Sequence, residues 1–136
     1  MALTVPPTTQ RDLEGWADYT APIVLTPAAA ADVSPGCGDP ALAVIGFYAA
    51  LMRNDDVTGY LLTPDDNVMV RKLETLRSWT FRRLEVRSVR LRGSRKATIR
   101  IAVEIDVDGK RDDGTDEIKL QRDGDDGPWR IERPPT

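Results

Sequence analysis

The chain has 136 residues, of which 40% are hydrophobic and 30% charged, and its formal net charge is −3. These values are typical of one soluble globular domain, and so small a net charge does not indicate a nucleic-acid-binding protein. No apolar run approaches the roughly 20 residues that a membrane-spanning helix needs. The chain contains no histidine, which excludes histidine general bases, Ser-His and Cys-His pairs and nearly all zinc or iron sites. We therefore expect no metal and no cofactor.

The first 38 residues differ in composition from the rest of the chain. They hold five of the ten prolines and the tract TPAAAAD at 26–32. We interpret residues 1–38 as an arm that is partly ordered by packing on the domain or on a neighbouring subunit, with a flexible tail as the alternative for residues 1–10. The single cysteine, Cys37, lacks an activating base, so its role is left open. The start MALTVPPTTQ has no secretory signal, which predicts a cytoplasmic protein unless a leader has been removed.

Two helices are predicted at the start of the domain, which we place at residues 39–136. Asp39 is a good N-cap and Pro40 suits the first helical position, so a helix should run from Pro40 to about Arg53. It is apolar nearly all round, and Gly46 within it indicates close packing of another element. A short helical turn is expected at 57–62. A second helix should begin with Thr63 as its cap and end near Trp79.

From residue 80 onward the apolar period changes from helical to two. This pattern predicts four strands, at about 80–92, 96–107, 115–122 and 128–133. The turns between them are GSR, DGKRDDGT and DGDDG. Helices followed by hairpin-connected strands predict an α+β fold, with N-terminal helices packed on a curved four-stranded antiparallel sheet.

The first strand contains a change of parity that fixes its register. Leu84 and Val86 share one face, whereas Val89 and Leu91 have the opposite parity. A β-bulge in which Arg87 and Ser88 together oppose one residue restores all four to the same side. The resulting predicted pairs are Val89 with Ile99, Val86 with Ile101, Leu84 with Val103, and Arg83 with Glu104 as an ion pair.

Two stretches of the chain resemble members of the nuclear transport factor 2-like superfamily, whose fold is also called the cystatin-like α+β roll. These stretches are DPALAVIGFYAALMRNDD followed by VTGYLLTPDD, and the closing DGDDGPWRIE. The likeness covers about residues 39–133 and is closest to small uncharacterised bacterial members. It implies the roll fold and a homodimer in which open sheet faces pack together. It carries no diagnostic catalytic motif, so no catalytic residue is implied.

The predicted register places only apolar side chains on the inward face of the sheet, which indicates a filled core. Its members are Leu84, Val86, Val89, Leu91, Ile99, Ile101, Val103, Ile105, Val107, Ile118, Leu120, Trp129 and Ile131. A shallow cleft is the alternative, in which Tyr48, Tyr60, Trp79 and Asp55 would bind a small apolar ligand. A Tyr–Asp pair there, with Asp55 or Asp56, would be the best acid–base constellation in the chain.

The remaining charged segments point to surface roles. The acidic stretch DVDGKRDDGTDE does not have the spacing of a calcium loop. Eight basic residues on the first predicted hairpin lack interleaved aromatics, which favours ion pairs or an acidic partner surface over nucleic acid; they are Arg82, Arg83, Arg87, Arg90, Arg92, Arg95, Lys96 and Arg100. The sequence therefore predicts a non-catalytic binding or assembly module, most simply a homodimer. The alternatives are a small-ligand-binding or isomerase-like protein and an accessory domain of a secreted or anchored protein.

Overall fold

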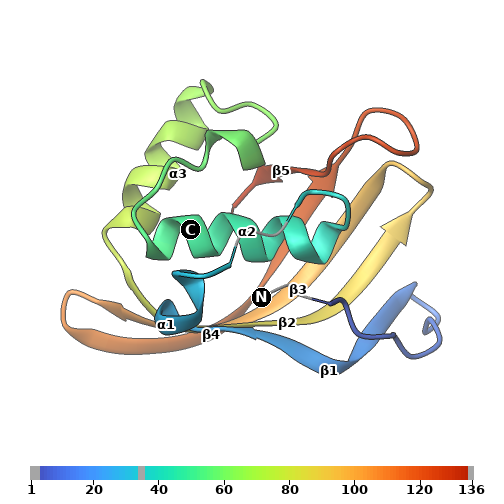
Figure 1. Ribbon diagram of the computed structural model, residues 1–136, viewed down its shortest axis with the longest axis horizontal. Helices are drawn as coiled ribbons and strands as arrows, with labels where there is room; N and C mark the ends of the chain where they lie inside the picture. Colours follow the sequence, from blue (N-terminus) through green and yellow to red (C-terminus); the bar gives the residue numbers. More distant parts are fainter. Residues whose placement is uncertain (1–3, 34–35, 135–136) are drawn as a thin grey trace.

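A computed structural model describes residues 4–33 and 36–134. It is an α+β fold whose five strands form one antiparallel sheet in the order of the chain. The strands are β1 (Trp16–Leu25), β2 (Thr80–Arg92), β3 (Lys96–Val107), β4 (Lys110–Gln121) and β5 (Arg130–Arg133). The helices are α1 (Pro27–Ala30), α2 (Pro40–Met52), the 3-10 turn η1 (Thr58–Tyr60) and α3 (Asn67–Arg77). The sheet curls beneath α2 (Figure 1), and we call the side that faces α2 the inner face and the other side the outer face.

The prediction of four strands is wrong, because the segment read as part of an arm supplies a fifth. Strand β1 pairs with β2, with Trp16 opposite Arg90 and Leu25 opposite Leu84. Its register shifts between Asp18 and Ile23, so the segment lacks the strict alternation by which a strand is recognised. A strand thus precedes the helices. Residues 1–3 and 34–35 of the predicted arm lie outside the described residues.

Helix α2 lies as predicted over the inner face and is buried along almost its whole length. The Asp39 carboxylate accepts a hydrogen bond from the N–H of Ala41 at 2.8 Å, and Pro40 takes the first turn. Gly46 provides the predicted close approach: a Cβ atom built there would lie 2.6 Å from Cε1 of Tyr60. The aromatic ring of Tyr60 therefore rests directly on the backbone of α2.

Helix α3 begins three residues later than a Thr63 cap would place it. The cap is Asp66, whose Oδ1 accepts hydrogen bonds from the N–H groups of Val68 and Met69 at 3.0 and 3.1 Å. The preceding residues are held elsewhere, since the N–H of Leu62 donates to the Ile131 carbonyl of β5 at 2.9 Å. Thr63 then begins a turn and not a helix, since its carbonyl accepts a hydrogen bond from the N–H of Asp66 at 3.2 Å.

The predicted β-bulge and register of the first hairpin are confirmed. The structure pairs Val89 with Ile99, Val86 with Ile101, Leu84 with Val103 and Arg83 with Glu104, and its register shifts between Val86 and Ser88. A second shift, between Phe81 and Arg83, was not predicted. Two irregularities in one strand increase its twist and bend, which fits the curl of the sheet around α2.

The second hairpin is longer than predicted, because its turn contains two residues instead of eight. Asp108 and Gly109 both have positive φ values, 52° and 80°, and Val107 pairs directly with Lys110. This is the geometry of a type I′ turn, for which Asp-Gly is a preferred sequence. Residues 110–114, which we expected in the turn, therefore belong to β4, and the hairpin tip projects beyond the helices at the lower left of Figure 1.

The core lies between α2 and the inner face. Most of the predicted core residues are buried there, together with Tyr19, Ile23 and Leu25 of β1. Val89, Val103 and Val107 are half-buried and Leu91 is exposed. Within residues 4–33 and 36–134, no helix is long and apolar enough to cross a membrane.

Candidate functional site

The four predicted ligand-binding residues do not line one common cleft. Tyr48 is 1% exposed and contacts Phe81 edge-to-face with ring centroids 5.4 Å apart, while Trp79 lies 6.3 Å from the same ring. Tyr60 packs on Gly46, which is about 200° around α2 from Tyr48. Asp55 is exposed beyond the end of α2, where it pairs with Arg53 at 2.8 Å.

A carboxylate that the sequence analysis missed, Asp116, lies nearer to Tyr48. It pairs with Ile101 in the sheet and therefore lies on the inner face, as does Asp112 opposite Ile105. Burial raises the pKa of Tyr48, and the Asp116 charge raises it further. Partial burial also raises the pKa of Asp116 itself. The expectation that the inward face is apolar throughout is thus wrong at the uncovered half of β4.

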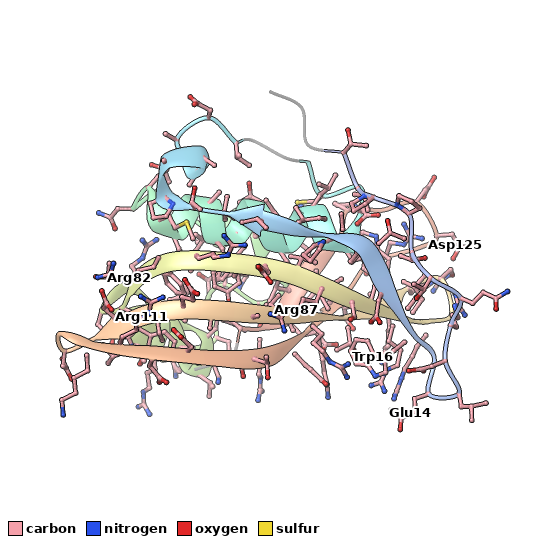
Figure 2. The ribbon with its side chains drawn as sticks, turned by 90° about the horizontal axis from the view of Figure 1, so that it is seen from below. Glu14, Trp16, Arg82, Arg87, Arg111 and Asp125 are labelled. Atoms are coloured by element: carbon pink, nitrogen blue, oxygen red, sulfur yellow. The ribbon has the colours of Figure 1, made fainter. Side chains whose placement is uncertain are left out.

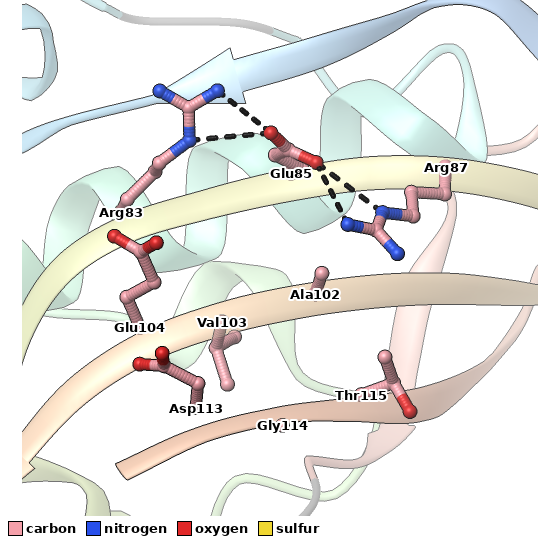
Figure 3. Close-up of a pocket in the computed structure, with 9 residues that line it drawn as sticks. All are labelled: Arg83, Glu85, Arg87, Ala102, Val103, Glu104, Asp113, Gly114 and Thr115. Carbon is pink, nitrogen blue, oxygen red and sulfur yellow. Dashed lines mark hydrogen bonds and ion pairs between the residues drawn. The ribbon is translucent and has the colours of Figure 1, made fainter. Parts of the chain in front are cut away.

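Tyr48, Tyr60, Trp79 and Asp55 line none of five hollows on the surface of the described residues. One of 380 Å³ lies on the outer face across β2, β3 and β4 (Figure 3). Its position follows from the register, because Ala102 stands between Glu85 and Thr115 in one cross-strand row. The small Ala102 side chain leaves room there that longer neighbours would fill.

Two charged clusters border this hollow on opposite sides. On β2, Glu85 accepts from Arg83 at 2.6 Å and from Arg87 at 3.2 Å. These contacts are drawn in Figure 3. We call Arg83, Glu85 and Arg87 the β2 cluster. With two arginines and one carboxylate, it carries a net charge of +1.

Across the hollow, Arg111 of β4 lies 3.2 Å from Glu104 and 3.4 Å from Asp113. We call Glu104, Arg111 and Asp113 the β4 cluster; with one arginine and two carboxylates, it carries a net charge of −1. The predicted ion pair between Arg83 and Glu104 is not formed, although the two residues are in register. Each binds within its own cluster instead, because closer partners of opposite charge lie on the same side.

Glu85 makes the stability of the protein depend on pH. The hydrogen bonds from Arg83 and then Arg87 lower the pKa of Glu85. A carboxyl group whose pKa is lower in the folded state contributes stability above its ordinary pKa and loses it as the pH falls through the folded value.

We expect Glu85→Gln to lower the free energy of unfolding by about 1 kcal/mol or less at pH 7, as for partly exposed ion pairs. The difference from the wild type should shrink as the pH falls below about 4. Urea unfolding of both proteins across this pH range measures it. A difference that stays constant with pH would contradict the assigned role of Glu85.

The basic residues singled out in the sequence divide into two groups. Arg82, Arg83, Arg87, Arg95 and Arg100 each lie within 4 Å of a carboxylate, as expected for ion pairs. Within the described residues, Arg90, Arg92 and Lys96 form no such pair. Figure 2 shows Arg82 and Arg111 near one end of the sheet and Trp16 near the other. The unpaired group belongs to the end that carries Trp16, since Trp16 pairs with Arg90.

Comparisons with family models, with curated proteins and with solved structures give no match to this chain. The resemblance to the nuclear transport factor 2-like superfamily therefore stays a prediction.

Proposed function

We propose that this chain is a non-catalytic assembly module that forms a homodimer through the outer face of its sheet. The observation that carries the proposal is the self-complementary arrangement around the 380 Å³ hollow. The β2 cluster, with net charge +1, lies on one side of Ala102, and the β4 cluster, with net charge −1, lies on the other.

Such an arrangement matches itself under a two-fold rotation. A two-fold axis that lies in the plane of the contact, parallel to the strands and above Ala102, would place the β2 cluster of one copy over the β4 cluster of its partner, and the reverse. This is an isologous contact, the commonest kind in soluble oligomers. Charge complementarity of this type orients two surfaces and suppresses wrong registers.

The outer face is also large enough for the contact. Strands β2, β3 and β4 have 12 or 13 residues and extend about 40 Å, and together with the ten residues of β1 they span about 19 Å. The face therefore offers about 750 Å², close to the roughly 800 Å² that each partner contributes to a typical stable interface.

The ligand-binding or isomerase-like alternative has less support. Tyr48, its central residue, is 1% exposed and packed between Phe47 and Phe81. A general acid or base must come within hydrogen-bonding reach of its substrate, and Tyr48 could do so only if α2 moved away from the sheet.

Sedimentation equilibrium tests the proposal with two matched substitutions to arginine. Ala102→Arg places a long charged side chain in the hollow and should convert the dimer to a monomer. Val70→Arg alters an exposed valine of α3 and should leave the dimer unchanged. The wild-type dimer should weaken with added salt, because exposed charges are screened.

Circular dichroism shows whether each variant is folded. A wild type that stays monomeric at every concentration tested would overturn the homodimer. A dimer that persists in folded Ala102→Arg would overturn the outer face as its interface.

A further inference from the structure

We infer that a pocket at the end of the sheet near Trp16 binds a compact multivalent anion bearing phosphate or carboxylate groups. The pocket measures 190 Å³ and lies outside the hollow around Ala102. Its polar lining consists of Arg90, Arg92, Lys96, Thr98, Lys119 and Glu132.

The register of three strands brings these side chains together. Arg90 of β2, Thr98 of β3 and Lys119 of β4 form one cross-strand row, and Arg92 pairs with Lys96 in the next row on the same face. Four cationic side chains thus converge from three consecutive strands. Arg92 and Lys96 are therefore directly opposed like charges, and such a pair destabilises a sheet.

The charges in the pocket are not balanced by the protein. Four cations face one carboxylate, Glu132, which leaves a net charge of +3. Among residues 4–33 and 36–134, none of the four cations has a carboxylate oxygen within the 4 Å of an ion pair, whereas arginines elsewhere on the outer face have such partners. A bound anion would supply the missing countercharge through charge-assisted hydrogen bonds.

One arginine that lines the pocket is held in place by an aromatic ring and has an unsatisfied N–H group. Nε of Arg90 is buried and has no hydrogen-bond partner within the described part of the chain. Its guanidinium is held against the indole ring of Trp16 at 4.9 Å, and that of Arg100 lies 4.0 Å from the same ring. Buried N–H groups without partners are rare and costly, so a partner for this one is expected.

The dimensions of the pocket select a small ligand. A volume of 190 Å³ is below the range of about 300–1,000 Å³ that is typical of sites for larger organic molecules. No aromatic side chain lines it, whereas single-stranded nucleic acids are usually bound by stacking on aromatics. Lys96, Arg92 and Lys119 are exposed at its mouth, while Thr98 is 6% exposed and offers a hydroxyl within it.

Pyrophosphate and citrate are suitable probes, and isothermal titration calorimetry at constant ionic strength measures their binding. We expect saturable binding of at least one of them to the full chain. Lys119→Gln should weaken that binding about tenfold, the effect of losing about 1.4 kcal/mol of binding free energy. The matched control is Lys110→Gln at the tip of the β3–β4 hairpin, which should bind as the wild type does.

The two probes also identify the chemical group. Tighter binding of pyrophosphate assigns the pocket to phosphates, and tighter binding of citrate assigns it to carboxylates. Absence of saturable binding for both would overturn the inference, as would equal weakening by Lys119→Gln and Lys110→Gln. Because the pocket lies on the outer face that the proposed dimer would use, folded and monomeric Ala102→Arg should bind the preferred probe at least as tightly as the wild type does, so failure of the dimer would leave this inference standing.

Discussion

Leu25→Ala should lower the free energy of unfolding by about 2–5 kcal/mol, the usual cost of removing a fully buried leucine side chain. Leu25 is 1% exposed and pairs with Leu84 where β1 meets β2. The matched control is Leu13→Ala, because Leu13 precedes β1 and is 107% exposed. Its replacement should change the stability by less than about 0.5 kcal/mol.

Urea unfolding followed by tryptophan fluorescence measures both variants. The signal sums Trp16 in β1, Trp79 after α3 and Trp129 beside β5. A single transition that coincides with the loss of circular dichroism would therefore show that β1 unfolds with the rest of the fold. If Leu25→Ala were as mild as Leu13→Ala, β1 would not contribute to the core and the segment would be the loosely packed arm that its composition indicates.

The parts of the fold that were predictable are those in which local chemistry and burial agree. Asp39 followed by Pro40 starts α2 at the residue expected, because the carboxylate caps the helix and proline needs no N–H donor there. The parity change between Val86 and Val89 located the bulge. One face of β2 is apolar and the other is polar, so a register shift of one residue would move the apolar side chains to the solvent-exposed face. Each inference rested on one physical requirement that only one arrangement satisfied.

The parts that were missed lack such a requirement. In the first half of β4 both faces meet solvent, so Asp112, Gly114 and Asp116 could occupy inner-face positions without an apolar pattern to mark the strand. The Asp108-Gly109 turn was the available signal, and the charged residues after it concealed it. The position of Asp116 near Tyr48 depends on this register, so the carboxylate could not be identified before the hairpin was known.

The outer-face hollow and the basic pocket could not be predicted from the sequence for a related reason. The basic residues were visible as a group, but which of them find carboxylate partners depends on pairing across three strands. Arg83 illustrates this point: its register partner Glu104 was predicted correctly, yet its guanidinium binds Glu85 of its own strand. Backbone pairing therefore does not determine ion pairing on an exposed sheet face, because long side chains there can reach several neighbours.

Tyr48→Ala should lower the free energy of unfolding by about 3–5 kcal/mol, the usual cost of removing a buried aromatic ring. Tyr48→Phe should cost less than about 1 kcal/mol, because it keeps the contacts with Phe47 and Phe81. The hydroxyl that it removes forms no hydrogen bond within residues 4–33 and 36–134.

Alkaline unfolding distinguishes a Tyr48 side chain that only fills the core from one whose hydroxyl is a required polar partner. Burial and the Asp116 charge raise the pKa of Tyr48, so the unfolded chain ionises first and the folded state loses stability as the pH rises above about 10. Urea titrations between pH 8 and about 11 should therefore show a smaller loss for Tyr48→Phe than for the wild type. Some alkaline sensitivity should persist in the variant, because burial also raises the pKa of Tyr19. If Tyr48→Phe instead cost several kcal/mol at neutral pH, the hydroxyl would be a required polar partner, and the filled core on which the non-catalytic assignment depends would have to be abandoned.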